Sequence, residues 1–112
     1  MFNQQNKVIR PASDEHFAMI AAEGVGTVLA AQFGSFYEVI GQDAKFVANA
    51  CNLVMTKRTT QTGSVAMVGF PYHSAEARFR EIVHAGKAVS VAEPDRHGIL
   101  RVVRHIKAKA AA

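Results

Sequence analysis

The stretch that most constrains the fold of this chain is residues 27–40. Residues 27–33 are apolar and partly β-branched, which is typical of a buried strand. Gly34 and Ser35 then break or bulge the strand, and an apolar run resumes over residues 36–40. These two apolar segments are expected to pair within a β-sheet, and other elements must pack against the apolar face of that sheet.

The resumed strand begins Phe36-Tyr37-Glu38. Because side chains alternate between the two faces of a strand, Phe36 and Glu38 are expected on one face and Tyr37 on the other. A ring beside a carboxylate suits recognition of nucleic-acid bases. The flat ring can insert between stacked bases, and the group next to it can hydrogen-bond to a base. The alternative is an edge strand with one half-exposed Phe and a solvated Glu. Spacing alone favours this alternative.

Three segments have helical signals. The first has Ser13 as N-cap, two acids in its first turn and Gly24 at its end. Its inner face is predicted to hold Phe17, Ile20 and Ala21, with His16 on the surface. The second opens at residues 41–43 and has an apolar stripe made of Ala44, Val47, Ala50, Cys51 and Val54.

The third helix is expected to start at Ser74 as N-cap and to end at Gly86. Phe79, Ile82 and Val83 should face inward, and His84 outward. Residues 54–70 are predicted to form a hairpin with a polar turn at residues 59–63, and two further strands are expected at 88–92 and 99–106. The order favours an α/β (α+β) domain, a mixed β-sheet of about five to six strands packed with three helices.

Composition is that of one folded domain: 112 residues, 49% of them hydrophobic. A single cysteine and the lack of an apolar leader favour a reducing, cytoplasmic location without a membrane. The net charge is +4, and cations follow Asp95 without any acid among them. This pattern favours a polyanionic partner; a solvated strand with a basic tail is the alternative.

The sequence lacks the common catalytic and metal-binding motifs. It has no phosphate-binding G-x-x-x-x-G-K-[ST] run, no C-x-x-C pair and no G-x-S-x-G nucleophile turn, and its five histidines lack ligand spacing. We therefore expect a protein that is not an enzyme and that uses no cofactor or metal.

Three motifs carry a family resemblance. They are Gly34-x-Phe36-Tyr37-Glu38, the run Thr56-Lys57-Arg58 and the run Gly69-Phe70-Pro71-Tyr72-His73. Their order and spacing resemble the N-terminal mismatch-recognition domain, domain I, of the MutS DNA mismatch repair family. The resemblance covers roughly residues 13 to 106.

The resemblance implies a role for particular residues. Phe36 would stack on a mispaired or unpaired base from the minor groove, and Glu38 would hydrogen-bond to that base. Lys57 and Arg58 would contact phosphates or the groove. Ser35, where the family has Asp, would lie at the rim, and His73 would shape a turn with the DNA backbone within reach. Tyr37 and Tyr72 are expected to be scaffold.

The sequence pattern and the resemblance together predict an organisation of the chain. We expect a flexible arm at residues 1–12, a free-standing domain at 13–106 and a basic flexible tail at 107–112, without the connector, lever, clamp and ATPase domains of the family. The expected partner is double-stranded DNA with mismatches or distortions, with a protein partner supplying clamp or motor, near the nucleoid. The alternatives are a general nucleic-acid-binding module and a protein-interaction module of a DNA-processing system or mobile element.

Overall fold

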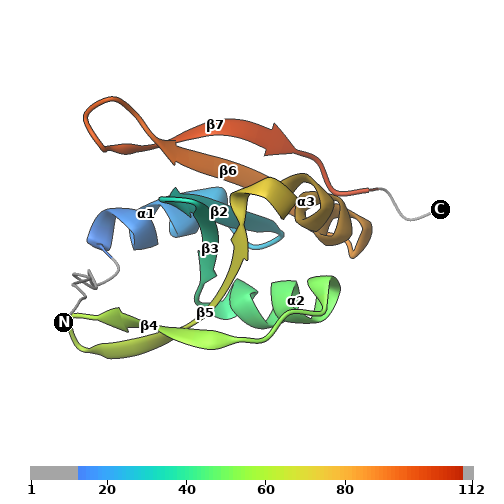
Figure 1. The fold of residues 1–112 in the computed structure, drawn as a ribbon, viewed down its shortest axis with the longest axis horizontal. Coiled ribbons are helices and arrows are strands. Elements are labelled where there is room, and N and C mark those ends of the chain that lie inside the picture. The colour runs from blue at the N-terminus through green and yellow to red at the C-terminus, as the bar shows by residue number, and fades with distance from the viewer. Residues whose placement is uncertain (1–12, 110–112) are drawn as a thin grey trace.

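The computed structural model describes residues 13–109, which form one six-stranded sheet with three α-helices (Figure 1). The expected mixed sheet with three helices is confirmed. The predicted arm at residues 1–12 and the end of the predicted tail, 110–112, lie outside the described residues. The elements in chain order are α1 (Asp14–Glu23), β2 (Thr27–Phe33), β3 (Phe36–Ile40), α2 (Gln42–Cys51), β4 (Thr56–Thr60), β5 (Gly63–Pro71), the 3₁₀ turn η1 (Tyr72–Ser74), α3 (Ala75–His84), β6 (Ala88–Pro94) and β7 (Leu100–Ile106).

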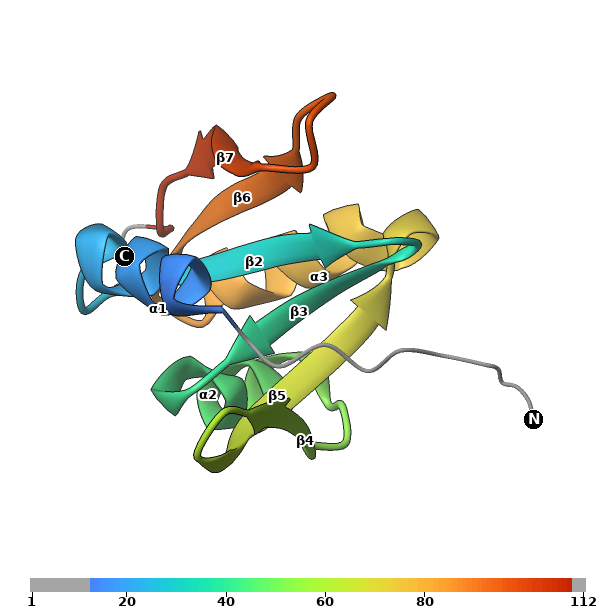
Figure 2. The same ribbon diagram turned by 90° about the vertical axis from the view of Figure 1, so that its left-hand side faces the viewer.

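The strands lie side by side in the order β4-β5-β3-β2-β6-β7. The β2–β6 pair is parallel, and every other neighbouring pair is antiparallel. Helices α2 and α3 lie behind the sheet in Figure 2, and α1 crosses its front. The two sheet faces therefore have different surroundings.

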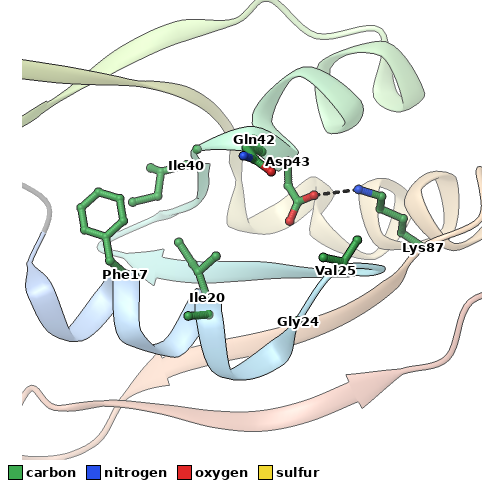
Figure 3. A pocket seen from close by; sticks show the side chains of 10 residues that line it. Phe17, Ile20, Gly24, Val25, Ile40, Gln42, Asp43 and Lys87 are labelled. Atoms are coloured by element: carbon green, nitrogen blue, oxygen red, sulfur yellow. Dashed lines mark hydrogen bonds and ion pairs between the residues drawn. The ribbon is translucent and has the colours of Figure 1, made fainter.

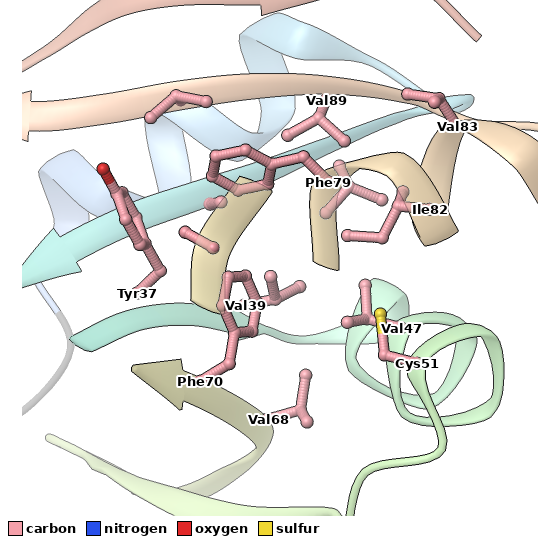
Figure 4. Close-up of a cluster of buried hydrophobic side chains, with 14 of the residues drawn as sticks. Tyr37, Val39, Val47, Cys51, Val68, Phe70, Phe79, Ile82, Val83 and Val89 are labelled. Atoms are coloured by element: carbon pink, nitrogen blue, oxygen red, sulfur yellow. The ribbon is translucent and has the colours of Figure 1, made fainter. Parts of the chain in front are cut away.

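The main core lies between the sheet and helices α2 and α3 (Figure 4). Strand side chains such as Val39, Val68 and Phe70 pack there against Phe79 and Ile82 of α3, and all five are almost fully buried. Burial of each such side chain stabilises the fold by about 1.5–3 kcal/mol. Cys51 joins this core as a buried thiol that donates to the Arg78 carbonyl at 3.6 Å, and chiefly its burial raises its pKa to about 12.

The other face has a smaller core under α1, built on Leu29, Ala31 and Ala92. Of the predicted inner face of α1, Ile20 is confirmed, whereas Phe17, Ala21 and the predicted surface position of His16 were wrong. His16 is 1% exposed, whereas Phe17 is 37% exposed and Ala21 is also exposed. Apolar periodicity selected Phe17, but the helix meets the sheet through residues 16, 19 and 20.

The strands predicted at residues 27–33 and 36–40 have the predicted bounds, but their connection and two other predicted boundaries differ from expectation. Residues 34 and 35 form the two-residue turn of a β2–β3 hairpin, and Phe33 pairs with Phe36 across it. Gly34 has φ +61°, which suits the first central position of such a turn. Val54 is 89% exposed because α2 ends at Cys51. The β4–β5 turn is only Gln61–Thr62, because strand pairing continues to Thr60 and Gly63.

The ends of α1 and α3 differ in their capping. The Ser13 side chain accepts a hydrogen bond from the His16 N–H at 3.1 Å, as expected for an N-cap. The Ser74 hydroxyl instead donates to the Pro71 carbonyl at 3.2 Å, because η1 precedes α3 and turns that side chain away. No helix within residues 13–109 is long and apolar enough to span a membrane.

Candidate functional site

Phe36 is half exposed at the start of β3, with 47% of its surface accessible. The strand places it opposite Phe33 of β2 and Pro71 of β5. Next to it, Tyr37 is 3% exposed and points into the main core. The predicted alternation is therefore confirmed: the ring of Phe36 stands on the α1 side of the sheet, and Tyr37 anchors the strand from the other side.

Aromatic neighbours hold Tyr37 on several sides (Figure 4). Its ring lies nearly parallel to that of Tyr72, with centroids 5.8 Å apart, and meets the edge of Phe79 at 5.4 Å. Its hydroxyl donates to Oε2 of Glu93 at 2.9 Å, and burial with this bond raises the pKa of Tyr37 well above its usual range. Tyr37 is thus scaffold, whereas Tyr72, 55% exposed, covers it from outside.

Glu38 stands on the same face as Phe36, yet its carboxylate is not free. The side chain is 12% exposed, and Oε2 lies 3.4 Å from Nη1 of Arg58. Oε1 is buried and has no hydrogen-bond partner among the described residues. Burial raises the pKa of Glu38, and the nearby Arg58 charge opposes part of that rise. A buried acceptor without a partner is costly, so this carboxyl favours a proton or a donor.

Arg58 and His16 lie close to Phe33. The Arg58 guanidinium lies 5.3 Å from the Phe33 ring centroid, and the His16 ring lies 5.6 Å from it. Nε2 of His16 is buried without a partner in the described part of the chain. Burial, followed by repulsion from Arg58, lowers the pKa of His16 to about 4, so this ring is neutral at physiological pH.

Of the other predicted site residues, some lie on the face that carries Phe36 and one lies on the opposite face. Ser35 is exposed at the turn, and its carbonyl accepts the Tyr72 N–H at 2.7 Å. His73 is exposed in η1, directly after Tyr72. Lys57 pairs with Ala66 on the opposite face from Arg58. The fold therefore brings Ser35, Phe36, Glu38 and Arg58 to one end and face of the sheet, and it places Lys57 behind them.

Phe33 and His16 were missed as neighbours of this site. The signal for Phe33 was the two-residue Gly34-Ser35 spacer between apolar runs, which is typical of a hairpin and sets Phe33 against Phe36. His16 had no comparable signal, since a histidine next to an apolar helix position is usually exposed.

The two arginines of β7 are both paired with acids. Arg101 contacts Asp95 at 3.0 Å, and Arg104 binds Glu76 through two hydrogen bonds. These contacts reduce the positive field that the sequence predicted for β7.

A pocket of about 550 Å³ lies between α1 and the start of α2 (Figure 3). Phe17, Ile20 and Val25 line it, together with the Asp43–Lys87 ion pair at 2.8 Å. None of the predicted site residues lines this pocket. The described residues contain no group of three or more His, Cys, Asp or Glu side chains able to hold a metal ion.

Comparison with known proteins gives one consistent result. The family model MutS domain I matches residues 12–106. A protein named DNA mismatch repair protein MutS from Parabacteroides distasonis is 33% identical over 88 residues, which cover 78% of this chain and 10% of that protein. Proteins of the same name from Cereibacter sphaeroides and Acaryochloris marina are 36% and 35% identical, over 66% and 70% of this chain and 9% of each protein. The chain spans about a tenth of the length of these curated relatives.

Proposed function

The chain belongs to the MutS domain I family, and on that premise we propose that it binds duplex DNA at mispaired or distorted positions. Phe36 is the group that enters the base stack. Binding rather than catalysis is the activity we assign to this domain.

The observation that carries this proposal is that Phe36 is exposed on a strand that the next residue anchors in the core. Its ring is half exposed on a strand whose next residue, Tyr37, is buried and hydrogen-bonded. A wedge must be rigid, because opening a stacked step costs about a few kcal/mol. A mismatched base has already lost pairing energy, so the cost is lower there. Discrimination then follows from deformability of the DNA more than from reading each base.

Glu38 adds selectivity in this proposal. Its ionised form is disfavoured by burial, and phosphates of an intact duplex disfavour it further. At a displaced base the carboxyl either accepts an N–H or, when protonated, donates to a ring nitrogen. Oε1, which has no partner in the described chain, can make this contact while Oε2 stays near Arg58; if the carboxyl moves away from Arg58, the guanidinium can turn to a phosphate. Ser35 and His73 flank the DNA, and Lys57 contacts phosphates only if the duplex reaches round the β4 edge.

Affinity is expected to be weak and salt-dependent, since Arg58, the cation that residues 13–109 place on this face beside Glu38, is already paired with that carboxylate. We therefore propose that the domain works with a protein partner that supplies clamp or motor functions, or with a second copy. Association with DNA would also place it at the nucleoid.

The test compares a labelled duplex with a G·T mismatch or a single-base bulge against its perfect homoduplex. Wild type should prefer the defective duplex modestly at low salt. Phe36→Ala should lose the preference and keep weak homoduplex binding. Equal binding of both duplexes by wild type would refute the proposal.

A second candidate is a protein-interaction module that kept the fold. The pairing of Glu38 with Arg58, and of Arg101 and Arg104 with acids, favours it, because these contacts leave less positive charge for DNA. Failure of either duplex to bind at low salt, with the fold intact, would support this candidate. Equal binding of single-stranded and duplex nucleic acid would instead support a general nucleic-acid binder.

A further inference from the structure

Gly69 differs from the other seven glycines of the chain. Each of those has a positive φ, between +61° and +149°, a conformation that favours glycine. Gly69 lies inside β5 and has no positive φ. The backbone therefore does not require glycine at this position.

Packing does not require it either. A Cβ atom at position 69 would lie 3.6 Å from Sδ of Met67, 3.6 Å from the Tyr37 carbonyl oxygen and 3.9 Å from Cδ1 of Phe36. These are ordinary van der Waals distances. A glycine inside a strand weakens it, and it often marks a site where a ligand approaches the backbone closely.

The missing side chain belongs to the face that carries the site. Gly69 pairs with Glu38, and side chains of paired residues share a face. The Phe36 ring is the nearest side chain of the site, as the 3.9 Å distance shows. The backbone of β5 at Gly69, which no side chain of its own covers, therefore lies next to the exposed Phe36 ring.

The backbone of Gly69 is also open on one side. The carbonyl of Ala66 accepts the Gly41 N–H on the β3 side, and amide directions alternate along a strand, so the Gly69 amides point away from β3. There β4 begins at Thr56, opposite Met67. Within residues 13–109, no strand pairs with β5 on that side beyond Met67.

We propose that Gly69 is a specificity-determining position, at which the nucleotide that stacks on Phe36 comes close to the bare strand. This inference rests on the proposed function. Any side chain at position 69 would stand beside the stacked base and its sugar, and it would hold them off the Phe36 ring. Intact duplex, which does not enter this space, would bind as before.

The test uses Gly69→Ala and Gly69→Val in the full chain. We expect thermal stability unchanged or higher for Gly69→Ala, because a Cβ atom fits at this position and restricts the unfolded chain. We expect affinity for the mismatched duplex to fall by about three- to tenfold for Gly69→Ala and further for Gly69→Val, with homoduplex affinity changed by less than about twofold. Ser64→Thr adds one methyl group to the exposed, opposite face of β5 and should change neither.

The outcomes separate this inference from the function on which it rests. A wild-type preference that Gly69→Ala and Gly69→Val both retain overturns the inference and leaves the proposed function standing. A lower melting temperature in Gly69→Ala, with equal losses for both duplexes, makes the glycine structural and also overturns it. Absence of any wild-type preference removes the proposed function, and the inference falls with it.

Discussion

Nη1 of Arg58 lies 3.4 Å from Oε2 of Glu38, so the carboxylate beside Phe36 already has a cation next to it in the free protein. The pair joins β4 to β3 across the intervening β5. Attraction between the charges offsets part of the desolvation cost of Glu38, while Oε1 keeps no partner in the described chain. A DNA phosphate that attracts Arg58 would therefore change the protonation of Glu38 as well as its position.

Arg58→Met tests this coupling. Removing the guanidinium removes the interaction that lowers the pKa of Glu38, while burial, which raises it, remains. The pKa of Glu38 should therefore rise above its wild-type value in an NMR titration of the side-chain carboxyl carbon. Lys57→Met removes a charge from the opposite face of the same strand and is the control. An equal shift in both variants would indicate a general charge effect and not the Arg58–Glu38 contact.

Glu38→Gln should have opposite effects on affinity and on selectivity. The amide removes a charge that phosphates repel, so homoduplex affinity should rise roughly threefold at low salt. The preference for mismatched DNA should shrink, because the penalty on intact duplex is lost. Glu81→Gln, which removes a charge on α3 beyond the opposite sheet face, should alter neither. Tighter homoduplex binding by both variants would assign the effect to net charge alone.

His16→Leu should remove an acid sensitivity of the fold. The pKa of His16 is about 4 in the folded protein, below the usual 6.5, so the unfolded chain binds the proton more tightly. Stability is then full above about pH 6.5 and is lost as pH falls towards 4, by about 3 kcal/mol for this group. Urea unfolding of wild type and variant between pH 7 and pH 4 measures the difference.

The matched variant for that experiment is His84→Gln, because His84 is exposed on α3. It should leave the acid sensitivity of wild type unchanged. If His16→Leu lost as much unfolding free energy as wild type between pH 7 and pH 4, the buried imidazole would not be the source of the acid sensitivity.

Alternation and turn residues predicted much of this fold from local sequence. They placed Phe36 and Glu38 on one face of the strand and Tyr37 on the other, because the strand period leaves little freedom once β3 is recognised. They did not predict that His16 would be buried, since that depends on how α1 docks on the sheet. The contact between Arg58 and Glu38 also depends on sheet order, in which β5 lies between their strands. Long-range placement of this kind is not encoded in any local spacing.

Tyr37→Phe tests whether Glu93 fixes the strand between Phe36 and Glu38. The change keeps the ring stack and removes the hydrogen bond from the hydroxyl to Glu93, which should cost about 1–3 kcal/mol of unfolding free energy because the acceptor is charged. Tyr72→Phe keeps the exposed partner ring and should cost far less. Because the folded pKa of Tyr37 is raised, wild type should also lose stability as pH rises above about 10, where the unfolded tyrosine ionises first. Tyr37→Phe should lose less over that range in denaturant titrations. A cost of Tyr37→Phe in unfolding free energy no greater than that of Tyr72→Phe would show that the bond to Glu93 does not hold this strand.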